Sequence, residues 1–331
     1  MKKTILAKKR FRILPFCLLP ALLLAGLGWA ALRVRAPASK PAQPRAVTVT
    51  LARMNQAAEE QAAPISARSR RPYCYTVLLA GLDDAGGGSD TNLLLRIDVP
   101  LRQMDLVSLP RDTVLHHEWH SNKLNYAYAS GGIELLRREI ENLLGVPVDF
   151  FVTVDLRGFE KLVDGIGGID FDVPADMDYD DGAQDLHIHF SKGPRHLNGR
   201  EAMAVARWRK NNTGGGYADA DVGRIRTQQA LLKALAEKAV SLGSVPALVR
   251  LFFTCVHTDL SAGNLVWLGE QAMEIGMEGL RFHTLPGNGA GYYRGESVYV
   301  PDPDAALALV NEALNPYDTP LLPEELDILV P

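Results

Sequence analysis

The chain has 331 residues, of which 47% are hydrophobic and 22% are charged, and its formal net charge is −4. Eight of its 35 Lys and Arg residues lie in the first 36 positions, which contain no acid, so 27 remain against 39 Asp and Glu. Nucleic-acid binding rests on a basic surface, so we predict no nucleic-acid partner for this acidic body. A site for anions must instead be a local cluster of basic side chains.

An uncharged, mostly apolar run at 13–32 follows the basic N-terminus. About 20 such residues cross a bilayer as a helix, and basic residues before it favour an inside N-terminus. We therefore predict a cytoplasmic tail over 1–12, a single transmembrane helix over 13–32 and an extracytoplasmic domain at the cell membrane. The alternative is a cleaved signal peptide with Ala36-Pro37-Ala38 as its processing site, which also exports the domain.

Residues 33–72 are rich in Ala, Pro, Gln and Arg and are predicted to form an extracytoplasmic linker, with a short helix near 51–63. The rest has the size of one globular domain, with a core over 73–242 and a C-terminal part over 243–331 packed on it. Cys74 and Cys255 either form one disulfide or remain buried thiols.

Strands and helices alternate along this domain. Apolar runs predict strands at 75–82, 92–97, 104–109, 150–154, 169–173 and 280–285. Apolar residues at helical spacing predict helices at 132–144, 159–166, 201–207, 224–242, 262–275 and 305–314. The turn at 98–102 makes the second and third strands an antiparallel hairpin. We therefore predict an α/β fold with a mixed central β-sheet covered by helices on both faces.

Charged residues follow two of these strands. Asp83 and Asp90 flank Gly86-Gly87-Gly88, and the glycines let the chain fold back so that both carboxylates reach one Mg²⁺. Arg111 follows Pro110 at the end of another strand and presents a rigid guanidinium fork. The structural alternatives are a flexible turn with solvated aspartates and a surface Arg paired with a neighbouring Asp.

Two pairs of polar residues extend this set of candidates. Lys123 and Asn125 share one face if their segment is extended, and the alternative is a polar strand edge. Arg207 and Arg209 can hold one ligand only if their helix stops between them, which the Asn- and Gly-rich run at 211–216 favours. The alternative is a basic helix end stabilised by the helix dipole.

The start of the long helix carries three more candidates. Arg224 and Gln228 are four residues apart and share a face, and Asp221 is placed to cap the helix. A helix start offers an anion free N–H groups as well as the cation. The alternative is a capped helix with a solvated face.

Several histidines resemble metal ligands without forming a convincing site. His116, His117 and His120 match no zinc spacing with a third ligand, and His187 with His189 alternate in a short strand that we expect to be exposed. The chain contains neither a Gly-x-Ser-x-Gly nor a Walker motif, which argues against a hydrolase triad or an NTPase.

In this order the motifs resemble those of the LytR-CpsA-Psr family of envelope proteins. They are Leu79-Ala80-Gly81-Leu82-Asp83, Ser89-Asp90-Thr91, Ser108-Leu109-Pro110-Arg111-Asp112-Thr113, Lys123-Leu124-Asn125, Gly165-Ile166-Gly167-Gly168-Ile169, Leu197-Asn198-Gly199-Arg200-Glu201-Ala202, Arg207-Trp208-Arg209 and Asp221-Val222-Gly223-Arg224. The resemblance implies a membrane-anchored phosphotransferase. Such an enzyme moves a glycopolymer, for example teichoic acid or capsular polysaccharide, from a polyprenyl-pyrophosphate carrier to peptidoglycan.

The resemblance also implies roles for the candidate residues. It makes Asp83, Asp90 and Arg111 catalytic, with Asp83 and Asp90 at Mg²⁺, or at Mn²⁺ as the alternative ion. The pyrophosphate would be surrounded by Arg111, Lys123, Arg207, Arg209, Arg224 and Gln228, with Asn125 and Asp221 in support. A deep apolar pocket under the sheet would take the lipid chain.

The sequence departs from the family pattern at two positions. Gly88 stands where the family often has Arg before Ser-Asp-Thr, and Thr227 stands where it usually has Arg. Arg226 is displaced by one residue, which turns a helical side chain by about 100°. These departures motivate one alternative, a polyprenyl-pyrophosphate-binding or sensor protein without turnover. A further alternative is a lipid-pyrophosphate hydrolase that uses water as the acceptor.

Overall fold

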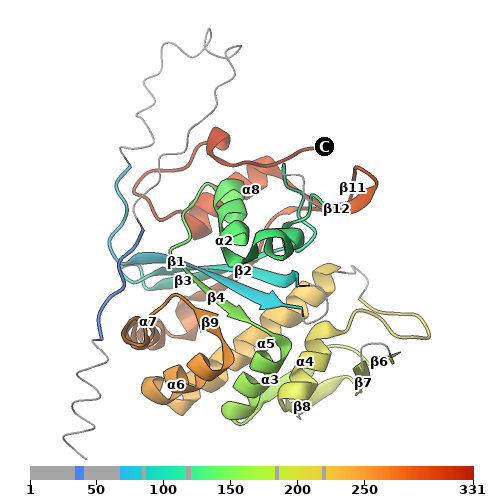
Figure 1. The fold of residues 1–331 in the computed structure, drawn as a ribbon. Coiled ribbons are helices and arrows are strands. Elements are labelled where there is room, and N and C mark those ends of the chain that lie inside the picture. Colours follow the sequence, from blue (N-terminus) through green and yellow to red (C-terminus); the bar gives the residue numbers. More distant parts are fainter. Residues whose placement is uncertain (1–33, 41–67, 84–86, 117–120, 183–185, 218–220) are drawn as a thin grey trace, which may run out of the picture.

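The computed structural model describes residues 34–40, 68–83, 87–116, 121–182, 186–217 and 221–331. A six-stranded sheet with the strand order β10-β3-β2-β1-β4-β9 runs through its centre (Figure 1). Its strands are β1 (Cys74–Leu82), β2 (Ser89–Asp98), β3 (Gln103–Leu109), β4 (Phe150–Val154), β9 (His257–Thr258) and β10 (Leu280–Thr284). The predicted antiparallel hairpin is confirmed, because β2 pairs antiparallel with β3.

Four strands of the sheet run in the same direction and end at one edge. β1 is parallel to β4, β3 is parallel to β10, and β2 lies antiparallel between β1 and β3. The carboxyl ends of β1, β3, β4 and β10 therefore lie together. In open α/β sheets this edge is where ligands bind.

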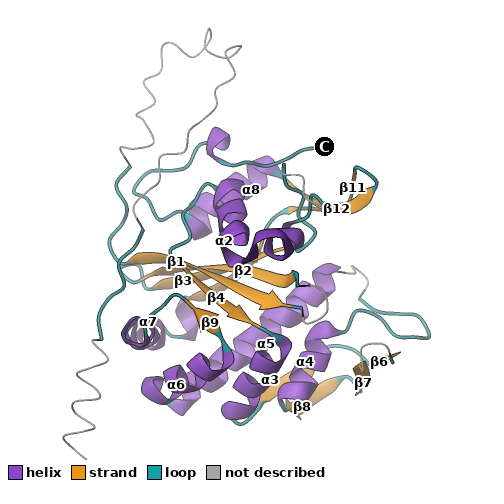
Figure 2. Ribbon diagram, in the orientation of Figure 1, coloured by secondary structure: helices purple, strands orange, loops and turns teal. Residues whose placement is uncertain are grey.

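One face of the sheet is covered by α2 (Leu124–Leu144), α8 (Pro303–Leu309) and the π-helical turn η3 (Val310–Leu314). Figure 2 shows α2 and α8 on this side of the strands. Leu78 and Leu94 of the sheet pack here with Leu136 and Ile140 of α2. α2 begins eight residues before the predicted helix, because non-helical backbone at Gly131 and Gly132 joins a short first segment to the predicted one.

The opposite face is covered by α3 (Leu156–Gly165), α4 (Gly199–Arg207), α5 (Asp221–Leu242), α6 (Val245–Cys255) and α7 (Ala262–Ile275). In Figure 1 these helices lie on the far side of the sheet from α2 and α8. The predicted mixed α/β fold with helices on both faces is thus confirmed. α6 was not predicted, because a short and almost entirely apolar run such as VPALVRLFFTC does not distinguish a helix from a buried strand.

Three two-stranded antiparallel sheets and two short helical turns complete the described fold. The sheets pair β5 (Ile169–Val173) with β8 (Gly193–Leu197), β6 (Met177–Asp181) with β7 (Leu186–Phe190), and β11 (Gly287–Tyr293) with β12 (Glu296–Pro301). The β6–β7 pair is a hairpin inserted between β5 and β8. The turns are η2 (Met277–Gly279) and η4 (Pro323–Glu325). The first two of these sheets extend the helical layer formed by α3 and α4 (Figure 1).

The described segments that precede β1 are attached to the domain by several contacts, among them a fully buried carboxylate. Asp149 is fully buried, pairs with Arg70 and accepts a hydrogen bond from the backbone N of Lys40 at 2.8 Å. The predicted cytoplasmic tail, the transmembrane helix and the short helix near 51–63 lie outside the described residues. Among the described residues, no helix is long and apolar enough to cross a membrane.

Cys74 and Cys255 are both buried thiols without a disulfide. Burial raises the pKa of the Cys74 thiol to about 11, and the nearby Asp98 carboxylate acts in the same direction. A raised thiol pKa favours the neutral form, so the reactive thiolate is scarce at pH 7. With Cys17 replaced by Ser, we expect native protein to react slowly with a disulfide reagent, at a rate that still rises between pH 8 and 10. Rapid labelling of both thiols before urea is added would contradict this expectation.

Candidate active site

A cavity of about 670 Å³ lies between the sheet and helices α3 to α6. Its charged and polar lining includes Asp83, Asp90, Thr91, Arg111, Asp155, Arg207, Arg209, Lys210, Arg224 and Gln228. Its apolar lining includes Leu79, Leu93, Val152, Val154, Phe159, Leu162, Leu231, Leu235, Phe252 and Val256. Seven of the ten predicted site residues therefore line one cavity, and the same cavity has an apolar part.

α5 shows how the polarity of the cavity changes along its length. Arg224, Gln228, Leu231, Leu232 and Leu235 all line the cavity and recur at helical spacing on one face. The rise of a helix separates the first from the last by about 16 Å. The wall is charged near the carboxyl edge of the sheet and apolar farther along, so it suits a ligand with an anionic head and a long apolar tail.

The carboxyl edge of the sheet supplies two acids and one arginine. The backbone N of Asp83 donates to the carbonyl O of Gly88 at 3.1 Å, which draws the end of β1 toward the start of β2. Arg111 follows β3 and donates from a terminal guanidinium N to Asp90 Oδ1 at 2.6 Å. The ends of β1 and β3 and the start of β2 therefore bring these charged residues together at one edge, with Arg111 paired to Asp90.

The end of α4 presents two arginines to the same cavity. α4 ends at Arg207, and Trp208 has an extended backbone with φ −62° and ψ 138°. The Trp208 side chain is 1% exposed, and its Nε1 donates to Asn211 Oδ1 at 3.0 Å. The helix thus stops where the sequence predicted, and Arg207 and Arg209 both line the cavity.

Arg224 is a largely buried cation in the cavity wall, with 9% of its surface exposed. A guanidinium in such surroundings attracts an anion more strongly than one in bulk water. Two hydrogen bonds fix the helix that carries it. Gln228 Nε2 donates to Ala206 O at 3.3 Å, and Gln229 Nε2 donates to Ser108 Oγ at 2.8 Å. α5 is thereby tied both to the end of α4 and to the end of β3.

Packing explains how the chain accommodates its two departures from the family pattern. Thr227 is buried, and its Oγ1 lies 2.6 Å from the Tyr217 hydroxyl and donates to Gly223 O. A neutral hydrogen-bonded side chain therefore fills that position. A Cβ at Gly88 would meet Asn125 O at 3.5 Å and no other described atom beyond its chain neighbours, so the described part of the fold leaves room there for a side chain. Lys210 adds a cation to the cavity that was not predicted.

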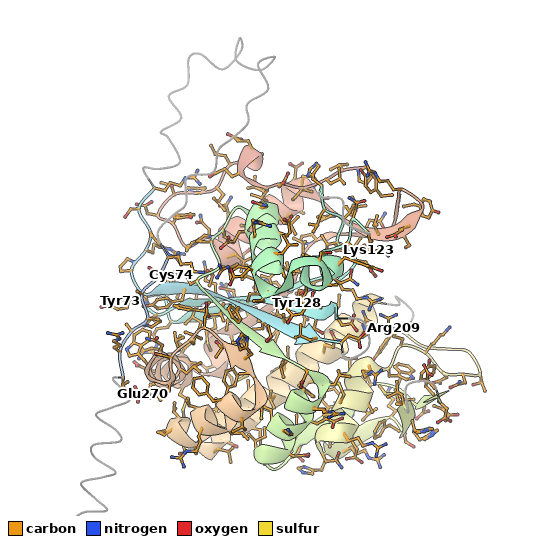
Figure 3. The ribbon with its side chains drawn as sticks, in the orientation of Figure 1. Tyr73, Cys74, Lys123, Tyr128, Arg209 and Glu270 are labelled. Carbon is orange, nitrogen blue, oxygen red and sulfur yellow. The ribbon has the colours of Figure 1, made fainter. Side chains whose placement is uncertain are left out.

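Lys123 and Asn125 are not among the residues that line the cavity. The prediction of an extended segment was wrong, because α2 begins at Leu124. Lys123 Nζ lies 3.6 Å from Asp112 Oδ1 and 3.8 Å from Glu296 Oε2. Figure 3 shows Lys123 and Arg209 near the same end of the strands, from elements on opposite faces of the sheet. The backbone N of Asn125 donates to Arg111 O at 3.0 Å, so this segment supports the Arg111 turn.

Two further predictions fall partly or wholly outside the described side chains. α5 starts at Asp221, whose side chain lies outside the described part, so its capping role stays a prediction. His116 Nδ1 lies 2.9 Å from Asp327 Oδ1, while His117 and His120 lie outside the described residues.

The β6–β7 hairpin forms a part of the cavity wall that was not predicted from the sequence. Tyr179 and Leu186 of this hairpin line the cavity. The signal was present in the alternation of MDYDD and LHIHF, two short runs of period two that a hairpin explains.

The chain is similar in sequence to curated teichoic acid transferases. The chain is 32% identical over 245 residues to the polyisoprenyl-teichoic acid–peptidoglycan teichoic acid transferase TagV of Bacillus subtilis (strain 168), covering 70% of this chain and 61% of TagV. It is 35% identical over 175 residues to the corresponding transferase TagU of Bacillus anthracis, covering 51% of this chain and 54% of TagU. The matched region thus spans little more than half the length of these curated relatives.

Solved structures show the same fold. The crystal structure of Bacillus subtilis TagV superposes with a TM-score of 0.60 at 27% identity, covering 71% of this chain and 94% of that chain. TagT bound to LI-WTA superposes with a TM-score of 0.57 at 23% identity, covering 75% and 92%. The model of the LytR_cpsA_psr family matches residues 46–315, which include the sheet and every residue of the described cavity. The chain therefore belongs to the LytR_cpsA_psr family.

Proposed function

We propose that this protein transfers a glycopolymer from a polyprenyl-pyrophosphate carrier to peptidoglycan. The observation that carries the proposal is one cavity in which four arginines lie together with Asp83 and Asp90 and which continues into an apolar space. A lipid pyrophosphate has the matching shape, because its anionic head is followed by a long hydrocarbon chain. The TagV and TagU relatives are transferases of polyisoprenyl-linked teichoic acid, which supports the same substrate class.

The reaction exchanges the phosphoanhydride bond of the carrier for a phosphodiester bond to peptidoglycan. A sugar hydroxyl of peptidoglycan attacks the sugar-proximal phosphorus, a new P–O bond forms, and the bond from that phosphorus to the bridging oxygen breaks. Polyprenyl phosphate leaves, and the hydroxyl proton passes to solvent or to the leaving phosphate. Arg111, Arg207, Arg209 and Arg224 hold the phosphates and neutralise the charge that spreads over their oxygens.

The residues at the sheet edge fit a divalent cation. Asp83 and Asp90 both line the cavity beside the arginines, and their carboxylates are the hard oxygen donors that Mg²⁺ prefers. We propose that these two aspartates hold Mg²⁺, or Mn²⁺ in its place, which would supply further positive charge at the phosphates. Arg111, which donates to Asp90 Oδ1, would then orient that carboxylate and contact a phosphate.

The location proposed for this reaction is the outer side of the cell membrane. It rests on the basic residues before 13–32 and on the apolar run itself. An anchor there would keep the domain at the bilayer that holds the carrier.

The proposal is tested by supplying purified protein with a polyprenyl-pyrophosphate-linked glycan, with and without peptidoglycan oligomers. We expect covalent attachment of the glycan to peptidoglycan and release of polyprenyl phosphate, both requiring the acceptor. Release without acceptor would identify a hydrolase instead. Tight co-purification of the lipid without release under either condition would identify a binding protein, the alternative that the neutral Thr227 favours.

A further inference from the structure

A group of histidines and aspartates lies on the outer face of the β6–β7 hairpin, away from the proposed reaction. Asp178 and Asp180 of β6 face His189 and His187 of β7 in the antiparallel register. The four residues are exposed, whereas Ile188 between the histidines is fully buried. Each strand therefore contributes its alternate residues to one small polar surface, which we call the His–Asp face.

The contacts within the His–Asp face resemble a metal site rather than isolated ion pairs. His189 Nδ1 lies 2.8 Å from Asp178 Oδ1, and His189 Nε2 lies 3.3 Å from Asp180 Oδ1. His187 Nδ1 also bonds Asp180 Oδ1. Ligand atoms of Asp180, His187 and His189 lie within 4.8 Å of one another, a grouping found nowhere else in the described part of the chain.

The chemistry of these donors selects a class of ion. Imidazole nitrogens with one carboxylate oxygen suit zinc and its neighbours among the divalent transition metals better than Mg²⁺. Three protein ligands leave a fourth position for water. Donor atoms around a tetrahedral zinc are about 3.3 Å apart, so small rotations of these exposed side chains would complete the site.

Asp178 has the position of an orienting partner. A metal-bound histidine commonly donates its second ring N–H to a carboxylate, which fixes the ring and raises its basicity. Asp178 Oδ1 is placed to accept from His189 Nδ1, which leaves Nε2 directed toward Asp180. The backbone holds Asp178 in turn, because Asp178 N donates to Asn211 Oδ1 at 2.8 Å.

We propose that the His–Asp face binds one zinc-class divalent ion through Asp180, His187 and His189, with Asp178 orienting His189. The site is distinct from the proposed Mg²⁺ position at Asp83 and Asp90. Its consequence for the fold is local: the ion would join β6 to β7, whose other side contributes Tyr179 and Leu186 to the wall of the cavity. Asn211 Oδ1 also accepts from Trp208 Nε1, so the hairpin is linked to the turn that carries Arg207 and Arg209.

The test is a zinc titration of untagged full-length protein after treatment with EDTA, in excess Mg²⁺ to occupy oxygen-only sites. Competition with a chromophoric zinc chelator measures stoichiometry and affinity. We expect one zinc per chain, a tenfold or greater loss of affinity in His187→Ala and His189→Ala, and a loss of about 10-fold in Asp178→Asn. Zinc should raise the melting temperature of the wild type and not that of His189→Ala.

His196→Ala is the matched control. His196 of β8 pairs with Asp170 of β5 at 2.7 Å, also as an exposed cross-strand pair, but with one histidine and one acid. We expect this variant to bind zinc as the wild type does. The proposal is overturned if the wild type takes up no zinc, if the His187→Ala/His189→Ala double variant keeps its affinity, or if His196→Ala loses as much. Circular dichroism checks that each variant is folded, so a loss of binding is attributable to the ligands.

Discussion

Replacement of Arg111 with Ala is expected to lower the rate of glycan transfer about 1,000-fold while the protein remains folded. Arg111 lines the charged end of the cavity and is 27% exposed, so its loss removes a cation from the phosphates without opening the core. An arginine that stabilises a phosphoryl-transfer transition state contributes on this scale. The measurement is the single-turnover rate with a polyprenyl-pyrophosphate-linked glycan and a peptidoglycan acceptor.

Two further variants test whether the effect depends on the guanidinium group and on its position in the cavity. Arg111→Lys keeps the charge but loses the guanidinium fork, so its rate should fall between those of the wild type and the Ala variant. Arg102→Ala removes an exposed arginine that pairs with Glu274 at the opposite end of the sheet, and it should transfer at the wild-type rate. A fully active Arg111→Ala protein would remove Arg111 from the site, while equal losses in Arg102→Ala would show a general effect of charge.

Replacement of Asp105 with Ala is expected to lower the free energy of unfolding by about 3–5 kcal/mol. Asp105 is fully buried in β3 and accepts from Arg96 at 2.7 Å, from Arg281 at 2.8 Å and from His283 at 3.0 Å. Removing the carboxylate leaves the buried Arg96 guanidinium without its main counter-charge, which is costly in a low dielectric. Urea denaturation followed by circular dichroism measures the change.

Asp170→Ala is the comparison for this stability measurement. Asp170 also pairs with a histidine, but its side chain is 85% exposed, so its removal should change the free energy of unfolding by less than about 0.5 kcal/mol. A change below 1 kcal/mol for Asp105→Ala would show that the three-strand ion cluster contributes little to stability.

The sequence could predict the site residues that lie at the ends of strands and helices. Asp83, Asp90 and Arg111 follow or open apolar strands, and a strand end determines where its next side chain lies. Arg207 and Arg209 were predictable through the run at 211–216 that stops α4. Local chemistry decides each of these positions, so a single sequence carries the information.

Other parts of the site depend on contacts between distant segments and could not be predicted in this way. Lys123 and Asn125 alternate as a strand would, yet the chain turns into α2 because Leu124 packs in the core beneath that helix. Tyr179 and Leu186 reach the cavity only because a small hairpin extends the α3–α4 layer. For Lys123 and Asn125, tertiary packing outweighed the local sequence pattern. For Tyr179 and Leu186, the two strands are so short that their alternation of polar and apolar residues does not identify a hairpin from sequence alone.

The change from charged to apolar residues along one face of α5 limits which sequence changes this helix can accept. Arg224 and Gln228 serve the head of the ligand, while Leu231, Leu232 and Leu235 serve its tail, all on one continuous helix. Substitutions at the apolar positions can therefore adapt the protein to carriers of different chain chemistry without disturbing the charged positions. Insertions or deletions between the two groups would disrupt the cavity wall, because each added or removed residue rotates one group by about 100° relative to the other. This helix is thus free to diverge in composition but is held to a constant length between Gln228 and Leu231.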